Sequence, residues 1–269
     1  MGSVKVVLLA GAAVLATSAV RAADLPPVMP APIIQPVVEE FSGWYLRGDI
    51  GMTNQRLNNI HNIQMDTATN LVWFDKGGFD SGILWGIGAG YQFSWFRFDA
   101  TGEYRGKVNF HALDSHAAGT NEYTASKSEW LFLANAYLDL GTWWCVAPFI
   151  GFGVGTARVQ IDHYRDNNIL AGGGGWADGD AVWNFAWAVH AGLAYKVSRN
   201  FAVELAYRYV DLGKGRTSDT INLDGSNPIL GNSTYFNGLS SHDIKLGMRW
   251  MLDFQPARPL YMPPLIRKG

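Results

Sequence analysis

Residues 96–105, which read FRFDATGEYR, decide the fold because apolar or small side chains alternate with polar ones at every position. One side carries Phe96, Phe98, Ala100, Gly102 and Tyr104, and the other carries Arg97, Asp99, Thr101, Glu103 and Arg105. Successive side chains of a β-strand point to opposite faces, and no helix has a period of two. The stretch therefore predicts a strand with one apolar and one charged face.

The same alternation recurs along the chain and predicts eight strands. The other seven are expected around residues 44–52, 82–92, 128–139, 147–157, 182–196, 203–209 and 243–252, of which 82–92 and 147–157 are rich in glycine. Short connections near Ser94, 142–145 and 198–200 separate long ones at 53–81, 106–127, 158–181 and 212–241. In an up-and-down arrangement all long connections lie at one end, which is the layout of outer-membrane barrels. We predict an all-β fold, an eight-stranded antiparallel up-and-down transmembrane β-barrel over residues 43–252.

The composition fits this class and excludes several others. The 269 residues are 48% hydrophobic and 16% charged, with 31 glycines, one cysteine and a net charge of −2. Disorder, collagen and a disulfide scaffold are excluded by these values. A nearly neutral chain offers no strongly basic surface, so nucleic acid is not an expected partner.

The N-terminus indicates export from the cytoplasm. Lys5 precedes an apolar run over 6–16 and a small-residue site at Val20-Arg21-Ala22, so residues 1–22 are predicted to be a signal peptide cleaved near Ala22. No later segment is long and apolar enough for a transmembrane helix. Residues 23–42 and 253–269 are rich in proline and are predicted to be a periplasmic linker and a periplasmic tail.

The charged face decides between a soluble barrel and a membrane barrel. A soluble lipocalin-like barrel keeps its charges outside, whereas a membrane barrel keeps them in its lumen. Acidic and basic residues are balanced on the polar faces, which suits a narrow lumen in which ion pairs neutralise one another. The predicted lumen network comprises Arg47, Asp49, Arg97, Asp99, Glu103, Arg105, Glu129, Asp139, Glu204, Arg208, Lys245 and Arg249. Aromatic residues predicted at the periplasmic rim also favour the membrane: Trp44, Trp95, Trp143, Trp144, Phe201 and Trp250.

Several short motifs together resemble a known family. They are the leader followed by Ala-Asp-Leu-Pro-Pro at 23–27, Gly-Trp-Tyr-Leu-Arg-Gly at 43–48, Gly-Ile-Gly-Ala-Gly-Tyr at 86–91 and Tyr-Arg-Tyr-Val-Asp-Leu-Gly at 207–213. The chain resembles the 25/31-kDa outer-membrane protein family of alphaproteobacteria, whose architecture is similar to opacity-type proteins and OmpA-like barrels. This resemblance implies an abundant surface antigen of the cell outer membrane with an eight-stranded barrel and no catalytic residues.

The last predicted strand carries a second resemblance. Lys245, Gly247, Trp250 and Leu252 match a signal read by the outer-membrane insertion machinery, which is therefore an expected partner. Most relatives end at an aromatic residue that closes this strand, whereas this chain continues through residues 253–269.

Other motifs do not predict catalysis, a metal or a cofactor. In Ser241-His242-Asp243 adjacent strand residues face opposite ways, so they cannot form a hydrolase triad. His61, His111, His116 and His163 are expected in solvated long loops, and His111, Asp114 and His116 are too few for a metal site. The glycine run at 172–175 lacks the context of a phosphate-binding loop. Paired carboxylates such as Asp99 and Glu103 suit ion pairing better than glycosidase chemistry.

The sequence thus predicts a non-enzymatic structural and surface protein with a porin-like barrel. Its long extracellular loops are expected to serve envelope integrity and surface recognition. A narrow ion channel is the first alternative, and a lipid-modifying enzyme is the second. The expected partners are outer-membrane lipid, lipopolysaccharide and an extracellular ligand. Aromatic residues for ligand contact are Trp73, Phe74, Tyr123, Tyr164, Trp176, Tyr235 and Phe236.

Overall fold

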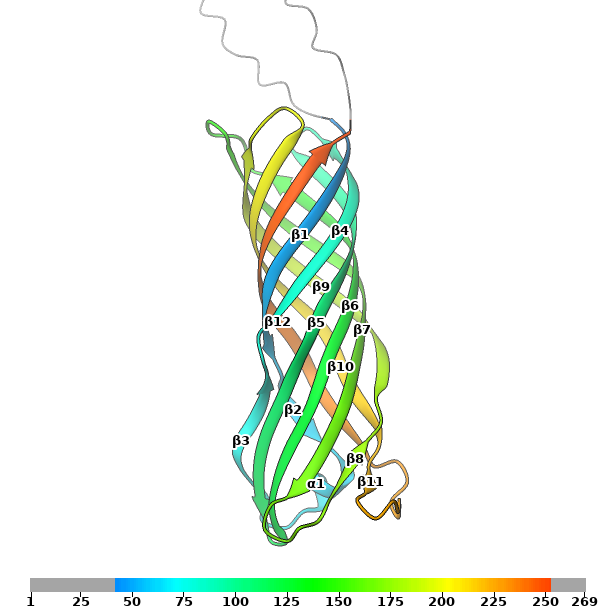
Figure 1. Cartoon of the computed structure of the whole chain (residues 1–269). Coiled ribbons are helices and arrows are strands. Elements are labelled where there is room, and N and C mark those ends of the chain that lie inside the picture. Colours follow the sequence, from blue (N-terminus) through cyan, green and yellow to red (C-terminus); the bar gives the residue numbers. More distant parts are fainter. Residues whose placement is uncertain (1–41, 253–269) are drawn as a thin grey trace, which may run out of the picture. The chain divides into compact units, whose positions relative to one another are not determined.

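The computed structural model describes residues 42–252, and these residues form a closed antiparallel sheet (Figure 1). The eight strands of the ring are β1 (Gly43–Arg56), β4 (Gly82–Phe93), β5 (Phe96–His116), β6 (Gly119–Asp139), β7 (Val146–Asn168), β9 (Asp180–Lys196), β10 (Phe201–Asp219) and β12 (Ser233–Met251). Each pairs with the next, and β12 pairs with β1 to close the barrel. The predicted eight-stranded barrel is confirmed.

The connections differ between the two ends of the barrel. The predicted short turns are confirmed, since β4 and β5, β6 and β7, and β9 and β10 are joined by only a few residues. At the other end the long loop predicted at 106–127 is wrong, because β5 and β6 run on to a tight turn. The other three predicted long connections remain, at residues 57–81, 169–179 and 220–232, but they are shorter than predicted because the strands, including the pair β10 and β12, continue farther. Short elements complete this end, namely β2 (Asn59–His61), α1 (Ile63–Thr67), β3 (Val72–Phe79), β8 (Gly174–Ala177) and β11 (Ile221–Asn222).

β-bulges explain why the two-residue alternation did not predict the parts of the strands farthest from the short turns. The register shifts between Arg105 and Val108 on β5, and again near Gly213 on β10. A bulge adds one residue to one strand and so reverses which positions face inward. Because the alternation breaks at these points, the sequence pattern ends there while the strands continue.

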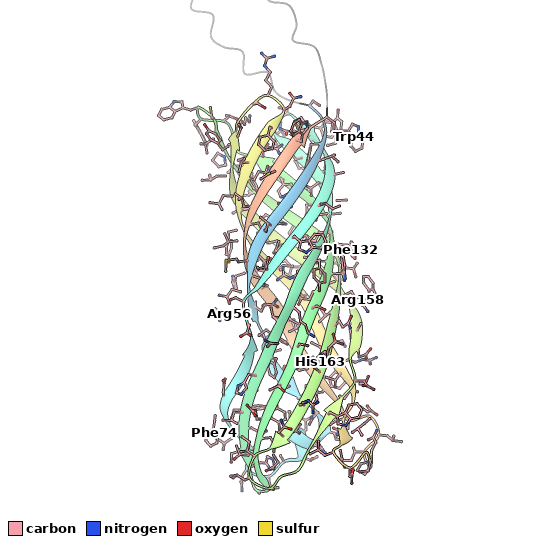
Figure 2. All side chains as sticks on the ribbon, viewed as in Figure 1. Trp44, Arg56, Phe74, Phe132, Arg158 and His163 are labelled. Carbon is pink, nitrogen blue, oxygen red and sulfur yellow. The ribbon has the colours of Figure 1, made fainter. Side chains whose placement is uncertain are left out.

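The outer wall of the barrel carries an apolar band next to the short turns. Its exposed side chains include Leu46, Ile50, Met52, Ile83, Ile87, Phe98, Phe132, Ile150, Phe152, Val189, Leu193, Leu205, Ile244, Leu246 and Met248. On β1 the band runs from Trp44 to Met52, close to the 9–11 tilted residues that cross a bilayer. Figure 2 shows this range along the barrel, with Trp44 at one end and Phe132 between Trp44 and the middle of the barrel.

Aromatic residues mark both edges of the band. Trp44, Trp95, Trp143 and Trp250 are more than half exposed at the end with the short turns. At the other edge Trp85 lies against Tyr104 and Trp130. Two such girdles delimit the hydrocarbon layer of a membrane barrel.

The strands are much longer than this band. β5 has 21 residues, which at about 3.3 Å per residue makes it about 70 Å long. Even with a tilt of about 40° this exceeds the apolar band of about 25 Å in outer-membrane barrels. About half of the barrel therefore projects beyond the membrane on the side away from the short turns.

In the part that the structure describes, no helix has the length and apolar character needed to cross a membrane. The predicted signal peptide (1–22), the tail (253–269) and all of the linker (23–42) except its last residue lie outside the described residues.

Candidate functional site

The barrel interior at membrane depth contains a network of buried ion pairs. At the short-turn end Arg47 on β1 pairs with Asp49 and with Asp99 on β5, each at 2.8 Å. Arg97 on β5 pairs across the lumen with Glu204 on β10 at 2.8 Å and with Asp139 on β6 at 3.0 Å. Arg249 on β12 also reaches Glu204, at 3.0 Å.

Through Arg208 the network continues toward the end of the barrel away from the short turns, which we call the outer end. Its guanidinium donates two hydrogen bonds to Glu103, at 2.9 and 2.6 Å, and lies 2.7 Å from Asp243. Lys245 on β12 pairs with Glu103 and also reaches Asp49 at 3.5 Å, which joins the two parts of the network.

The outermost part of the network centres on Arg105. Arg105 pairs with Asp243 at 2.7 Å and with Glu129 at 2.6 Å, and Glu129 in turn pairs with Lys127. The Lys127 ammonium also donates to Gln55 and lies 4.5 Å from the centre of the Phe79 ring.

All twelve predicted lumen residues lie in this network, together with two more. Asp243 and Lys127 are buried members that the predicted site did not include. Asp243 follows the alternation of its strand, so period two can find it, whereas Lys127 sits next to the register shift opposite Val108. With these two, the network holds seven basic and seven acidic side chains among the described residues.

The glycine-rich strands make room for these long side chains. A Cβ atom at Gly86 on β4 would lie 2.5 Å from Glu103, and one at Gly90 would lie 2.6 Å from Asp99. Arg97, Arg105 and Arg208 have essentially no exposed surface. An eight-stranded barrel has an interior only wide enough for side chains, and here charged side chains occupy it.

The Ser-His-Asp motif and the histidines, which did not predict a site, lie on different faces and strands of the barrel. Ser241 and Asp243 face the lumen, where they hydrogen-bond to each other, while His242 is on the outer wall against the Tyr207 hydroxyl. The histidines expected in loops lie in strands, with His61 in β2 and the others in β5 and β7. No group of metal-ligating side chains occurs within the described ranges.

Beyond the ion pairs the interior becomes apolar. Inward-facing residues of this layer include Phe79, Val108, Phe110, Ala112, Ala125, Val159, Ile161, Val210, Leu212, Phe236 and Leu239. The rings of Phe79, Phe110 and Phe236 pack within 6 Å of one another. The layer separates the lumen network from the outer end.

A cavity of about 460 Å³ lies at that outer end, beyond the apolar layer. Figure 1 shows α1, β2, β8 and β11 gathered there. The Asn62 side chain caps α1 by accepting from the Met65 amide and donates to Thr234 on β12, which fixes the helix beside the cavity. Met65 is buried and packs into the apolar layer.

Two buried carboxylates line this cavity. Asp114 on β5 accepts a hydrogen bond from the Tyr123 hydroxyl through Oδ2, but its Oδ1 has no partner. Asp166 on β7 is 7% exposed, and its Oδ1 also has no partner. Burial, reinforced by the charge of Asp114, raises the pKa of Asp166 from 3.8 to about 7. Burial raises the pKa of Tyr123 and Tyr164 as well.

This cavity was not found from the sequence. Tyr123 and Tyr164 were expected as loop residues for ligand contact, but both are buried strand residues. Tyr123 lines the cavity, and the Tyr164 ring stacks on it. Asp114 was considered only with His111 and His116 as too few ligands for a metal site, and His111 faces outward and pairs with Glu122. His116 does line the cavity, as do residues 173–175 of the glycine run.

Comparisons with known proteins find a matching family of outer-membrane β-barrels. The model of the outer membrane protein beta-barrel domain matches residues 10–250. An uncharacterized protein of Brucella suis is 28% identical over 88% of this chain and 94% of its own. A protein of Rickettsia prowazekii that is named as a candidate adhesin is 28% identical over 77% of this chain and 86% of its own. The crystal structure of the outer membrane protease OmpT from Escherichia coli covers 78% of this chain and 94% of its own, with 8% identity and a TM-score of 0.50.

Proposed function

Since the chain belongs to the family of the outer membrane protein beta-barrel domain, we propose that it is a structural protein of that membrane. In this proposal the lumen of the barrel is closed, and the projecting half of the barrel recognises ligands at the cell surface. The observation that carries this proposal is the unbroken series of buried ion pairs across the barrel at membrane depth. Breaking a buried ion pair leaves an uncompensated charge, so the network favours a closed lumen over an open water path. The similarity to a candidate adhesin supports a recognition role for the projecting half.

Outer-membrane lipid, with lipopolysaccharide in its outer leaflet, is the proposed partner of the outer wall. Just beyond the outer aromatic girdle the wall carries Arg56, Lys107, Arg158 and Lys214. Figure 2 shows Arg56 and Arg158 between Phe132 and His163 along the barrel. The Arg56 and Lys214 side chains make no ion pair within residues 42–252. Basic groups at this depth favour contact with the phosphates of the outer leaflet.

Two finer assignments rest on sequence motifs. We propose that the chain is a member of the 25/31-kDa outer-membrane protein group and is exported by cleavage near Ala22. We also propose that Lys245, Gly247, Trp250 and Leu252 form the signal for the insertion machinery. The alternation on β12 supports this, because Trp250 is exposed on the outer wall while Lys245 faces the lumen, and Leu252 is exposed just after the end of the strand.

The closed lumen is tested by two measurements on one refolded sample in detergent. Folded barrels migrate differently on a gel before and after heating, so a heat-dependent shift is expected. In planar bilayers the same sample is expected to give no discrete currents. Stable currents that change in Arg47→Ala or Arg249→Ala would instead favour a narrow channel, and solubility without detergent would exclude a membrane barrel.

The lipid contact is tested by comparing the heat stability of the barrel in vesicles with and without lipopolysaccharide. The wild-type protein is expected to be more stable with lipopolysaccharide, and Arg56→Glu/Lys214→Glu is expected to lose that gain. Lys76→Glu is the matched control, because Lys76 is exposed on β3 farther from the membrane. An equal gain in all three proteins would contradict the proposed contact.

A further inference from the structure

The cavity at the outer end has features of a ligand site that the structural role does not require. Its volume of about 460 Å³ lies in the range of small-molecule sites. Gln64, Ala118 and Gly173 in its lining are exposed, so the cavity is open to solvent on the outer side.

The charge of the cavity is not neutralised by the described residues. No ion pair reaches Asp114 or Asp166 within residues 42–252, in contrast to the carboxylates of the lumen network, which are paired with arginine or lysine. Buried charges are normally paired, because an isolated one is costly. Both carboxylates are more than nine-tenths buried, and each has an oxygen without a partner. A cation from outside the chain would satisfy them.

The rest of the lining indicates which kind of cation fits. Two further acceptors, Asn121 Oδ1 and Thr220 Oγ1, have no partner and line the same cavity. Met65, Leu71 and the Tyr123 ring add apolar surface. The cavity is much larger than one metal ion needs, and its mixture of acceptors and apolar surface suits an ammonium group on a hydrocarbon chain.

We infer that the outer cavity binds an aliphatic amine whose ammonium group is held between Asp114 and Asp166. The ammonium donates to the free carboxylate oxygens and to Asn121, and the methylene groups lie against Met65 and Leu71. The Tyr123 ring adds a favourable contact for a cation close to its face.

The ionisation of Asp166 gives this binding a pH dependence. The groups that face Asp166 are Asp114 from β5, Tyr123 from β6 and Tyr164 from its own strand, and His116 lines the same cavity. Because the pKa of Asp166 is about 7, its carboxyl group is mostly neutral near pH 5.5 and mostly charged near pH 8. Aliphatic amines stay protonated over this range, so their affinity is expected to rise with pH.

The inference deepens the proposed recognition role of the projecting half, but its test does not depend on that role. Purified full-length protein refolded in detergent is titrated with cadaverine and, separately, with pentanediol, which has the same chain length and no charge. Binding is followed by ligand-observed saturation-transfer NMR and calorimetry. Because no cell or surface partner is involved, failure of cell-surface recognition would leave this result intact.

Cadaverine is expected to bind and pentanediol is not. Asp114→Asn and Asp166→Asn are each expected to weaken cadaverine binding at least about tenfold, because each removes a charge-assisted hydrogen bond. Asp178→Asn, at an exposed position outside the cavity, is the matched control and should bind like the wild type. The heat-dependent gel shift verifies that every variant is folded.

Three results would overturn the inference. Equal binding of cadaverine and pentanediol would show that charge plays no part. Unchanged affinity in both cavity variants would place the amine elsewhere. Calcium binding that is lost in both variants, measured by equilibrium dialysis without any amine binding, would identify the cavity as a metal site instead.

Discussion

Arg208 on β10 links three strands of the barrel, because its guanidinium contacts Glu103 on β5 and Asp243 on β12. Arg208→Met is expected to lower the free energy of unfolding by about 3–5 kcal/mol, since it leaves buried carboxylates undercompensated. Arg208→Lys keeps the charge and is expected to cost less, although it loses the paired hydrogen bonds to Glu103. Denaturant unfolding of the refolded barrel measures both values. A methionine variant as stable as the wild type would mean that the network does not stabilise the barrel.

Asp166 gives the folded barrel a pH-dependent stability of its own. In the unfolded chain its pKa is 3.8, and in the folded protein it is about 7. Between these values the folded state binds more protons, so this group makes the protein less stable as pH rises from about 4 to about 7, with no further change above that. Asp166→Asn is therefore expected to lose less stability than the wild type between about pH 5 and pH 8.

Denaturant unfolding at the two pH values, in amine-free buffer, measures this difference. Asp178→Asn is the control, because Asp178 is exposed outside the cavity and makes no ion pair within residues 42–252, so its removal should leave the pH dependence of the wild type unchanged. An identical pH dependence in Asp166→Asn and the wild type would show that the carboxyl group of Asp166 titrates normally.

Individual lumen residues are predictable from sequence where the alternation is unbroken. Arg97, Asp99, Glu103 and Arg105, with Thr101 between them, occupy every second position of one strand, so their common face follows from the period alone. Asp114 lies on the same strand, but the bulge before Val108 changes the phase by one residue. Its burial depends on that shift and on cross-strand neighbours, which a pattern along one strand does not contain.

The bulges of the projecting half depend on residues that tolerate a left-handed backbone. Gly238 on β12 has φ of +64° and lies against Asn58, where a Cβ atom would meet the side-chain amide at 2.2 Å. Gly238→Val is expected to destabilise this region by at least about 1–2 kcal/mol, the cost of a left-handed conformation for an ordinary residue. Gly173→Val is the control, because Gly173 lies in open space.

Limited proteolysis of the refolded protein locates the effect. New cleavage in Gly238→Val is expected in the projecting half, while the strands at membrane depth stay protected by their ion pairs and by detergent. Cleavage spread evenly over the barrel would show that the bulge also supports the membrane-spanning part.

Strand ends were predictable at one end of the barrel and not at the other. The short turns after Phe93 and Lys196 are bounded by unbroken alternation, so their positions follow from the sequence. At the outer end the predicted limits at Arg105 and near Asp211 coincide with register shifts instead of chain reversals. A polar segment with a broken period is typical of a loop, and only pairing between strands shows that it continues as sheet.

The orientation of the whole barrel across the membrane can be measured by surface labelling. If the projecting half faces the outside, Asn109, exposed on β5 beyond the bulge, lies outside the cell, whereas Ile87, exposed on β4, lies in lipid. The exposed native Cys145 lies between β6 and β7 at the end with the short turns, which would then face the periplasm. A membrane-impermeant maleimide applied to intact cells is therefore expected to label Asn109→Cys in a Cys145→Ala background and to spare both the wild type and Ile87→Cys.

Permeabilising the outer membrane separates the two positions that are spared. Cys145 should then react, because it is in water on the inner side, whereas Ile87→Cys should remain unreactive in lipid. If Asn109→Cys reacted only after permeabilisation, the barrel would have the opposite orientation. The outer cavity and the basic residues of the wall would then face the periplasm, where lipopolysaccharide of the outer leaflet is absent, and the proposed lipid contact would fail together with the surface role.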